Sequence, residues 1–182
     1  MAALSGRTLQ LDRRGVVRWT CRYCGEEHDD LPFDWAFDAP SQWDGGRTSE
    51  DWLTDDLCVW TDDAGERAYF IRGVLYVPIV GTDQTLRYGV WSSLSKRSFE
   101  RVIDMWNDLS RVKEPPYFGW LANSIPDYPD TLNLPVDVVT DHAELRPTIV
   151  PHDSDHPLVR DQRQGIPLER VHEIAERRLH AA

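Results

Sequence analysis

The sequence lacks an apolar run of 18 residues, the length that a membrane-spanning helix requires. Its first 14 residues also contain no apolar core of the kind found in signal peptides. We therefore expect no association with a membrane and a location in the cytoplasm.

Sequence motifs for common enzyme classes are missing as well. The chain has no G-x-S-x-G or H-E-x-x-H motif, no phosphate-binding glycine loop and no dinucleotide fingerprint. The sequence therefore names no catalytic residue and no substrate, and it favours a protein that is not an enzyme.

Basic residues are fewer than acidic ones. The 182 residues include 20 Lys and Arg against 31 Asp and Glu, which gives a net charge of −11. The acidic residues are spread along the chain, and no basic stripe with interleaved aromatics offsets them. Because a nucleic-acid backbone would be repelled by this charge, we expect no nucleic-acid binding.

Cysteine occurs only three times, and two of the three form the pair Cys21-x-x-Cys24. An odd number of cysteines with one C-x-x-C pair fits a reducing compartment and metal binding better than a disulfide framework. Gly25 follows the pair and permits the left-handed backbone of a tight turn, and His28 is close enough to be a third ligand. The spacing predicts half of a structural zinc site, similar to the turn of a zinc ribbon.

A closed zinc site needs a fourth ligand, and Cys58 is the remaining cysteine. We predict a Cys3His zinc site from Cys21, Cys24, His28 and Cys58, so that residues 21–58 form the zinc-binding part of the chain. Three other interpretations stay open at this point. Cys58 and His28 could be a core residue and a surface residue, the cysteines could be a redox pair, or the metal could be catalytic, with Glu26, Glu27 or Asp56 as a nearby base.

A second polar cluster, weaker as a metal site, is formed by His152, Asp153, Asp155 and His156. Its spacing could bring the two imidazoles to one metal ion. Asp and His before Pro157 are equally typical of a turn that caps a helix, and we favour this interpretation.

Hydrophobic periodicity predicts one α+β domain over residues 1–182 with a mainly antiparallel sheet and a few packed helices, and we expect residues 1–15 to be poorly ordered. Extended runs of β-branched and aromatic residues predict strands at 7–11, 16–20, 57–61, 67–72, 74–80, 85–93, 136–140 and 146–150. Apolar residues at three- and four-residue spacing predict a helix that follows Ser95 and is ended by Pro115-Pro116, a second from about His156 to Arg163, and a third from Pro167. Residues 117–134 are rich in Pro and aromatics and predict an irregular crossing.

Eight tryptophans and one arginine suggest where a ligand could bind. Most tryptophans are expected in the core, but Trp91 and Trp120 could line a groove for a peptide or small ligand. Arg72 lies between two apolar runs, and an inward arginine can mark an anion site. The alternative for Arg72 is an outward position on a half-exposed strand.

The sequence resembles a bacterial family known as domain-of-unknown-function family 2199. The likeness is carried by these blocks: Cys21-x-x-Cys24-Gly25-x-x-His28, Leu31-Pro32, Ala39-Pro40, Asp56-Leu57-Cys58, Phe70-Ile71-Arg72-Gly73-Val74-Leu75, Gly89-Val90-Trp91-x-Ser93-Leu94-Ser95, Tyr117-Phe118-Gly119-Trp120-Leu121, Tyr128-Pro129-x-Thr131-x-x-Leu134, Arg146-Pro147, His156-Pro157-Leu158 and Gln162-x-x-Gly165-Ile166. The resemblance implies a bacterial origin and one folding unit over 21–182. It implies no activity, because none is established for the family.

Two functional hypotheses follow from these observations. The first is a cytoplasmic protein with a structural zinc site that acts as an accessory module and binds a protein or a small ligand. The second is a metal-dependent enzyme, hydrolase-like, with an open metal position.

Overall fold

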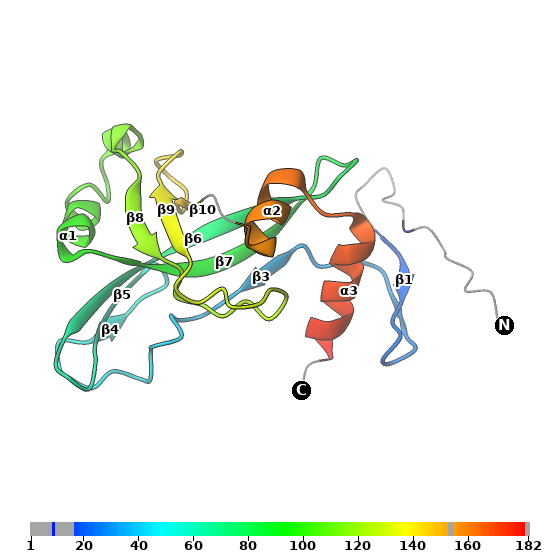
Figure 1. Ribbon diagram of the computed structural model, residues 1–182, viewed down its shortest axis with the longest axis horizontal. Coiled ribbons are helices and arrows are strands. Elements are labelled where there is room, and N and C mark those ends of the chain that lie inside the picture. Colours follow the sequence, from blue (N-terminus) through cyan, green and yellow to red (C-terminus); the bar gives the residue numbers. More distant parts are fainter. Residues whose placement is uncertain (1–8, 10–16, 153–154, 181–182) are drawn as a thin grey trace.

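The computed structural model describes residues 9, 17–152 and 155–180 of the chain (Figure 1). The strands in these residues are β1 (Trp19–Thr20), β2 (Glu27–His28), β3 (Asp34–Ala36), β4 (Trp52–Leu53), β5 (Leu57–Thr61), β6 (Arg67–Pro78), β7 (Thr85–Leu94), β8 (Tyr117–Trp120), β9 (Pro135–Val139) and β10 (Thr148–Pro151). The helices are α1 (Lys96–Asp104), the 3-10 helix η1 (Leu109–Lys113), α2 (Pro157–Gln164) and α3 (Leu168–Leu179).

The centre of the fold is the long hairpin of β6 and β7, which pair antiparallel from Tyr69 opposite Leu94 to Pro78 opposite Thr85. Alternate residues of β6, among them Leu75 and Val77, are fully buried, as the period of two in the sequence predicts. The predicted break between residues 72 and 74 is wrong, because β6 runs through Gly73. A Cβ at this position would lie 2.6 Å from the Cδ1 of Ile149, so the glycine lets β10 approach the strand.

The remaining strands extend this hairpin into one sheet of eight strands, in the order β3-β7-β6-β10-β9-β8, with β5 on the first half of β6 and β4 beside β5. The pairs β3–β7 and β10–β6 are parallel, and the other pairs are antiparallel. The predicted α+β class with a mainly antiparallel sheet is therefore confirmed. β1 and β2 form a separate small sheet.

The predicted irregular crossing over residues 117–134 contains a strand, β8. The strand ends beside β7, where the Trp120 N–H donates to the Ser93 hydroxyl and the Ala122 N–H donates to the Trp91 carbonyl. Gly119 permits this contact, because a side chain there would overlap the Ser93 carbonyl. Sequence reasoning missed β8 because its glycine and aromatics signal a loop as well as a close strand crossing.

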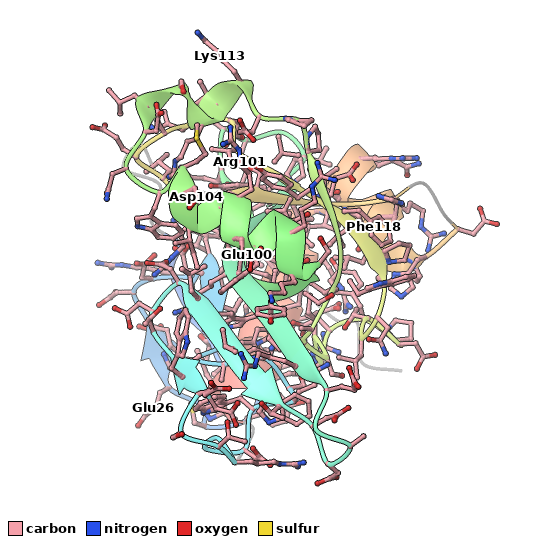
Figure 2. The ribbon with its side chains drawn as sticks, turned by 90° about the vertical axis from the view of Figure 1, so that its left-hand side faces the viewer. Glu26, Glu100, Arg101, Asp104, Lys113 and Phe118 are labelled. Carbon is pink, nitrogen blue, oxygen red and sulfur yellow. The ribbon has the colours of Figure 1, made fainter. Side chains whose placement is uncertain are left out.

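Helices cover the sheet at its two ends. α1 begins at Ser95, whose hydroxyl accepts a hydrogen bond from the Ser98 N–H, and it buries Phe99 against Tyr69 of β6 at a ring distance of 5.1 Å. Figure 2, which faces this end, shows α1 in front of the sheet and Lys113 of η1 projecting away from it. At the other end of the molecule α3 lies beside β1 (Figure 1). Its buried face consists of Leu168, Val171, Ile174, Ala175 and Glu176.

The helix that follows Ser95 is shorter than the sequence predicts. The helix after Ser95 was expected to continue to Pro115, but α1 ends at Asp104 and Asp108 caps the separate turn η1. The strand predicted at 7–11 and the poor order expected for residues 1–15 concern segments that lie largely outside the described residues. No helix in the described part of the chain is both long enough and apolar enough to cross a membrane.

Candidate metal centre

The two cysteines of the C-x-x-C pair lie in the loop of a small hairpin. β1 and β2 pair with Trp19 opposite His28, and the loop between them contains Cys21 and Cys24. The Cys21 N–H donates to the Glu26 carbonyl, and the Cys21 carbonyl accepts from the Gly25 N–H, both at 2.9 Å. Gly25 has a φ of +74°, the left-handed value that its position in the motif predicts. The hairpin therefore points both thiols and the His28 ring toward one place.

Four side chains that can bind a metal meet at this place: Cys21, Cys24, His28 and His180. One donor atom from each lies within 4.8 Å of the donor atoms of the other three. The Cys24 sulfur is 3.6 Å from Nε2 of His28. In a tetrahedral zinc site a thiolate and an imidazole nitrogen are separated by about 3.6 Å, given the usual bond lengths and angle. The arrangement therefore has the size of a metal site with two thiolates and two imidazoles.

The hairpin also supplies support for the ligands. The Tyr23 N–H donates to the Cys21 sulfur at 3.3 Å, a contact that stabilises negative charge on a thiolate. The ring of His28 stacks on Trp19 at 4.4 Å, and the Trp19 indole N–H donates to the Asp30 carbonyl. Trp19 thus fixes the orientation of the His28 imidazole.

The C-terminal helix brings His180 to the hairpin. Glu176 of α3 is buried, and its carboxylate accepts hydrogen bonds from the backbone N–H and the Nε–H of Arg22, both at 2.8 Å. One turn later, the His180 ring stacks on Tyr23 at 5.8 Å. Arg22 and Tyr23 lie between the two cysteines, so the same two residues anchor both the helix and the imidazole at its end.

The environment of the cluster is half buried. Cys21 is buried, His28 is partly buried, and Cys24 and His180 are exposed. Next to the cluster, His172 packs edge-on against Trp19, and burial lowers its pKa despite the nearby Glu176 carboxylate. A metal ion at the cluster would be reachable from solvent on the side of Cys24 and His180.

The structure does not bring Cys58 to this cluster. Cys58 lies on β5 opposite Phe70 and is fully buried in a separate apolar group with Trp91 and Ala122. Burial, together with the charge of Asp51, raises the pKa of the Cys58 thiol to about 12. Cys58 is kept away from the cluster by the pairing of β5 with β6, which places its thiol in the packed interior of the sheet. His180 occupies the place in the cluster that was predicted for Cys58.

His180 was missed because it follows a predicted amphipathic helix by one residue, with no neighbouring ligand in sequence. The only signal in the sequence was that residue 180 is a histidine, a residue type that can bind a metal. A candidate metal ligand so distant in sequence can be recognised only when the packing of the helix is known.

The second predicted cluster does not assemble in the described residues. His152 pairs with Asp137 at 3.1 Å. His156 is the N-cap of α2: its Nδ1 accepts from the Leu158 N–H, and its Nε2–H donates to the Pro129 carbonyl at 2.6 Å. Both histidines thus have other partners, as the capping interpretation predicts for His156; Asp153 lies outside the described residues.

The three predicted ligand-binding residues occupy different environments. Trp91 is fully buried, and its indole N–H donates to the Phe37 carbonyl at 3.0 Å, so it is part of the core. Trp120 is 46% exposed and packs on Phe118. Arg72 is partly buried opposite Trp91 in the register, with its guanidinium 5.9 Å from the Trp91 ring.

The chain matches the model of a protein family. The model of a family described as an uncharacterised protein conserved in bacteria, DUF2199, matches residues 20–166. The search of curated proteins found no significant match, and the search of solved structures found none either. The matched segment contains Cys21, Cys24 and His28, whereas His180 lies beyond it. Since the match extends over most of the chain, the protein belongs to the DUF2199 family of uncharacterised bacterial proteins.

Proposed function

We propose that Cys21, Cys24, His28 and His180 bind one zinc ion as a structural centre. The single observation that supports this most strongly is the convergence of four donor atoms within 4.8 Å from two segments far apart in the sequence. Two thiolates and two imidazoles at tetrahedral spacing are typical ligands of structural zinc. Carboxylate-preferring ions such as Mg²⁺ fit this donor set poorly.

The consequence of such a centre would be a link between the N-terminal hairpin and the C-terminal helix. Arg22 and Glu176, which already join these segments, are 154 residues apart. A metal that binds only the folded arrangement stabilises it by mass action, and closing a long loop restricts the unfolded chain. The zinc would therefore stabilise the fold at the point where its two ends meet.

The protein itself, in this proposal, is a binding module that lacks catalytic activity of its own. Four protein ligands leave no coordination position for a reactive water. The neighbouring Glu176 carboxylate is held by Arg22 and is 2% exposed, so it is poorly placed to serve as a general base. The alternative, a metal-dependent hydrolase, would require one ligand to leave the metal, and His180 is the residue that would have to do so.

Metal analysis of the purified protein and of three variants tests the proposal. We expect roughly one zinc ion per chain in the native protein and a loss of zinc in Cys24→Ser and His180→Asn. Cys58→Ser is the matched control and should retain the metal, because its thiol lies in a separate part of the core. Zinc retained in His180→Asn at unchanged affinity would contradict the four-ligand centre.

Cobalt substitution distinguishes a structural metal site from a catalytic one. Co²⁺ in a closed site of two thiolates and two imidazoles should give the intense visible spectrum of tetrahedral coordination. A weaker, five-coordinate spectrum that responds to added azide would indicate an open position and would favour the hydrolase instead.

A further inference from the structure

Three arginines line a groove between β6, η1 and the segment before β10. Figure 1 shows that α1, which η1 follows, lies at the opposite end of the molecule from α3 and β1. Its volume is about 380 Å³, within the usual range for small-ligand sites. Arg72 of β6, Arg111 of η1 and Arg146 line it, together with Trp106 and the two acidic residues Asp56 and Glu144. Three guanidinium groups against the carboxylates of Asp56 and Glu144 leave the groove positive, in a chain whose net charge is −11.

Backbone contacts hold the three guanidinium groups close together. Arg72 and Arg146 each donate to the same acceptor, the Asp55 carbonyl, at 3.4 Å. Arg111 donates to the Leu145 carbonyl at 3.0 Å, next to Arg146 in the sequence. The groups are therefore neighbours, although like charges repel one another.

Only one of the three charges is neutralised by a carboxylate. Asp56 pairs with Arg146 at 2.6 Å. Within the described part of the chain, neither Arg72 nor Arg111 has a carboxylate within ion-pair distance. Their guanidinium groups contact carbonyl oxygens and aromatic rings instead. The Nε atoms of both residues are buried and have no hydrogen-bond partner among these residues. Two cationic groups thus retain unused hydrogen-bonding capacity.

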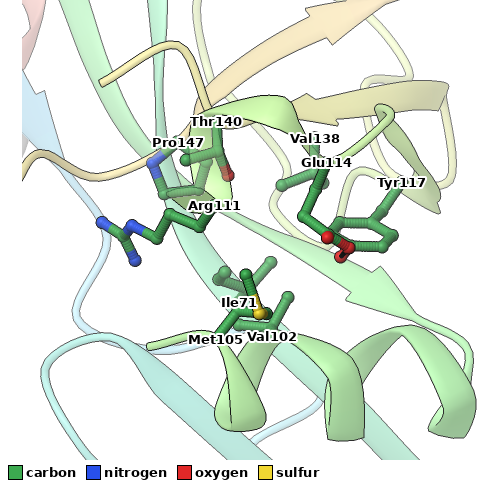
Figure 3. Close-up of a pocket in the computed structure, with 9 residues that line it drawn as sticks. All are labelled: Ile71, Val102, Met105, Arg111, Glu114, Tyr117, Val138, Thr140 and Pro147. Carbon is green, nitrogen blue, oxygen red and sulfur yellow. Dashed lines mark hydrogen bonds between the residues drawn. The ribbon is translucent and has the colours of Figure 1, made fainter. Parts of the chain in front are cut away.

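Aromatic rings and an apolar wall fix where the arginines lie. The Arg111 guanidinium is 5.5 Å from the ring of Trp106. Figure 3 shows the adjoining recess, where Ile71 and Met105 face its interior and the Arg111 guanidinium points away from Glu114. The volume of this recess is about 20 Å³, room for one water molecule, so it supports Arg111 and has no space for a ligand.

We propose that the groove binds the oxyanion of a small molecule, a phosphate or carboxylate group held between Arg72 and Arg111. The planar guanidinium fork matches the geometry of both oxyanions and can bind them with two parallel hydrogen bonds. Trp106 offers a flat apolar surface for the rest of the molecule. This assignment rests on the proposed function in one respect: it names the class of ligand that the proposed binding module would take. The groove itself shares no residue with the metal centre.

Titration of the zinc-loaded protein with inorganic phosphate, and separately with succinate, tests the assignment at constant ionic strength. Binding is followed by calorimetry and by the Nε–H NMR signals of the arginines. Phosphate, succinate or both should bind in the millimolar range or tighter and should shift the signals of Arg72 and Arg111. The stronger of the two probes identifies the oxyanion. No binding of either probe at tens of millimolar would overturn the assignment.

Three variants make the test specific. Arg72→Gln combined with Arg111→Gln should weaken binding about tenfold or more, and Arg111→Lys should weaken it less because the charge remains. Arg97→Gln, which removes one positive charge at an exposed position on α1, should bind like the native protein. Equal weakening by Arg97→Gln would overturn the assignment. So would shifts confined to other arginines, an observation on the native protein that does not depend on the variants being folded.

The two proposals can fail separately. Zinc bound at its expected stoichiometry in protein that binds neither anion would overturn the groove assignment alone. Anion binding that depends on Arg72 and Arg111 in protein that holds no zinc would support the groove and overturn the metal centre.

Discussion

The Glu176 carboxylate on α3 accepts hydrogen bonds from the backbone N–H and the Nε–H of Arg22 in the cysteine loop, both at 2.8 Å. This is the contact that brings His180, four residues further along, to Cys21 and Cys24. The local motif and the distant histidine become one cluster because of a buried carboxylate that is not among the four potential metal ligands.

Replacement of Glu176 by Gln should therefore affect both stability and metal affinity. Loss of the charged acceptor should lower the free energy of unfolding by about 1.5–3 kcal/mol, the usual range for a hydrogen bond to a charged group. Zinc affinity should fall as well, because His180 is held less firmly. Urea unfolding and competition with a zinc chelator measure the two effects.

Glu173→Gln is the control for that variant. Glu173 is exposed on the same helix and pairs with Arg170 three residues away. Such surface pairs contribute about 0.5 kcal/mol or less, so stability and zinc affinity should change little. Comparable effects of the two variants would show that Glu176 has no special role in joining helix and hairpin.

Cys24 and Cys58 should differ in reactivity toward alkylating reagents. In the native protein without metal, Cys24 should react readily with iodoacetamide because it is exposed, and bound zinc should protect it. Cys58 should stay unreactive with or without metal until the protein unfolds, because burial raises its pKa to about 12 and keeps it a thiol. Mass spectrometry of alkylated peptides measures each site, and alkylation of Cys58 in folded protein would contradict this placement.

Asp51 should make stability depend on acid pH. The Thr61 hydroxyl, which donates to its carboxylate at 2.6 Å, is the largest cause that lowers the pKa of Asp51 from 3.8 to about 2. A carboxyl group whose folded-state pKa is lowered stabilises the fold above its unfolded pKa and loses that contribution as the pH falls toward its folded pKa. Asp51→Asn should therefore lower the Tm near neutral pH, and the difference should shrink between about pH 4 and pH 2.

Asp83→Asn serves as the control for the pH series, since Asp83 lies on the exposed turn between β6 and β7. Its Tm difference from the native protein should stay smaller than that of Asp51→Asn at neutral pH. If the Tm difference between Asp51→Asn and the native protein persists unchanged to the lowest pH, the charge of Asp51 is not what stabilises the fold.

Gly119→Ala should destabilise the contact between β8 and β7. The added methyl would overlap the Ser93 carbonyl and the Ser92 hydroxyl, so the strands would have to separate, at a cost of about 2–3 kcal/mol. At Gly65, which has a φ of +83° and no atom within 4 Å of an added Cβ, alanine should cost only about 1 kcal/mol of backbone strain. Chemical unfolding measures the loss in free energy of unfolding for each variant. A smaller loss for Gly119→Ala than for Gly65→Ala would contradict the close contact between β8 and β7.

The sequence by itself determined the features that depend on neighbouring residues. Alternation along β6 and β7 follows from which residues can face the core, and the stripe of Leu168, Val171 and Ile174 follows from the period of a helix. The turn at Cys21 and Cys24 was predictable for the same reason, because Gly25 and the spacing act over a few residues.

Only the tertiary structure decided which distant segments meet. Cys58 and His180 were both available as a fourth ligand, and strand pairing buried the first while the Glu176 contact delivered the second. Gly73 and Gly119 signal breaks in a sequence, yet in the fold they are the places where two strands come closest. The grouping of Arg72 with Arg111 likewise depends on η1 packing beside β6, because no local rule relates side chains so far apart along the chain.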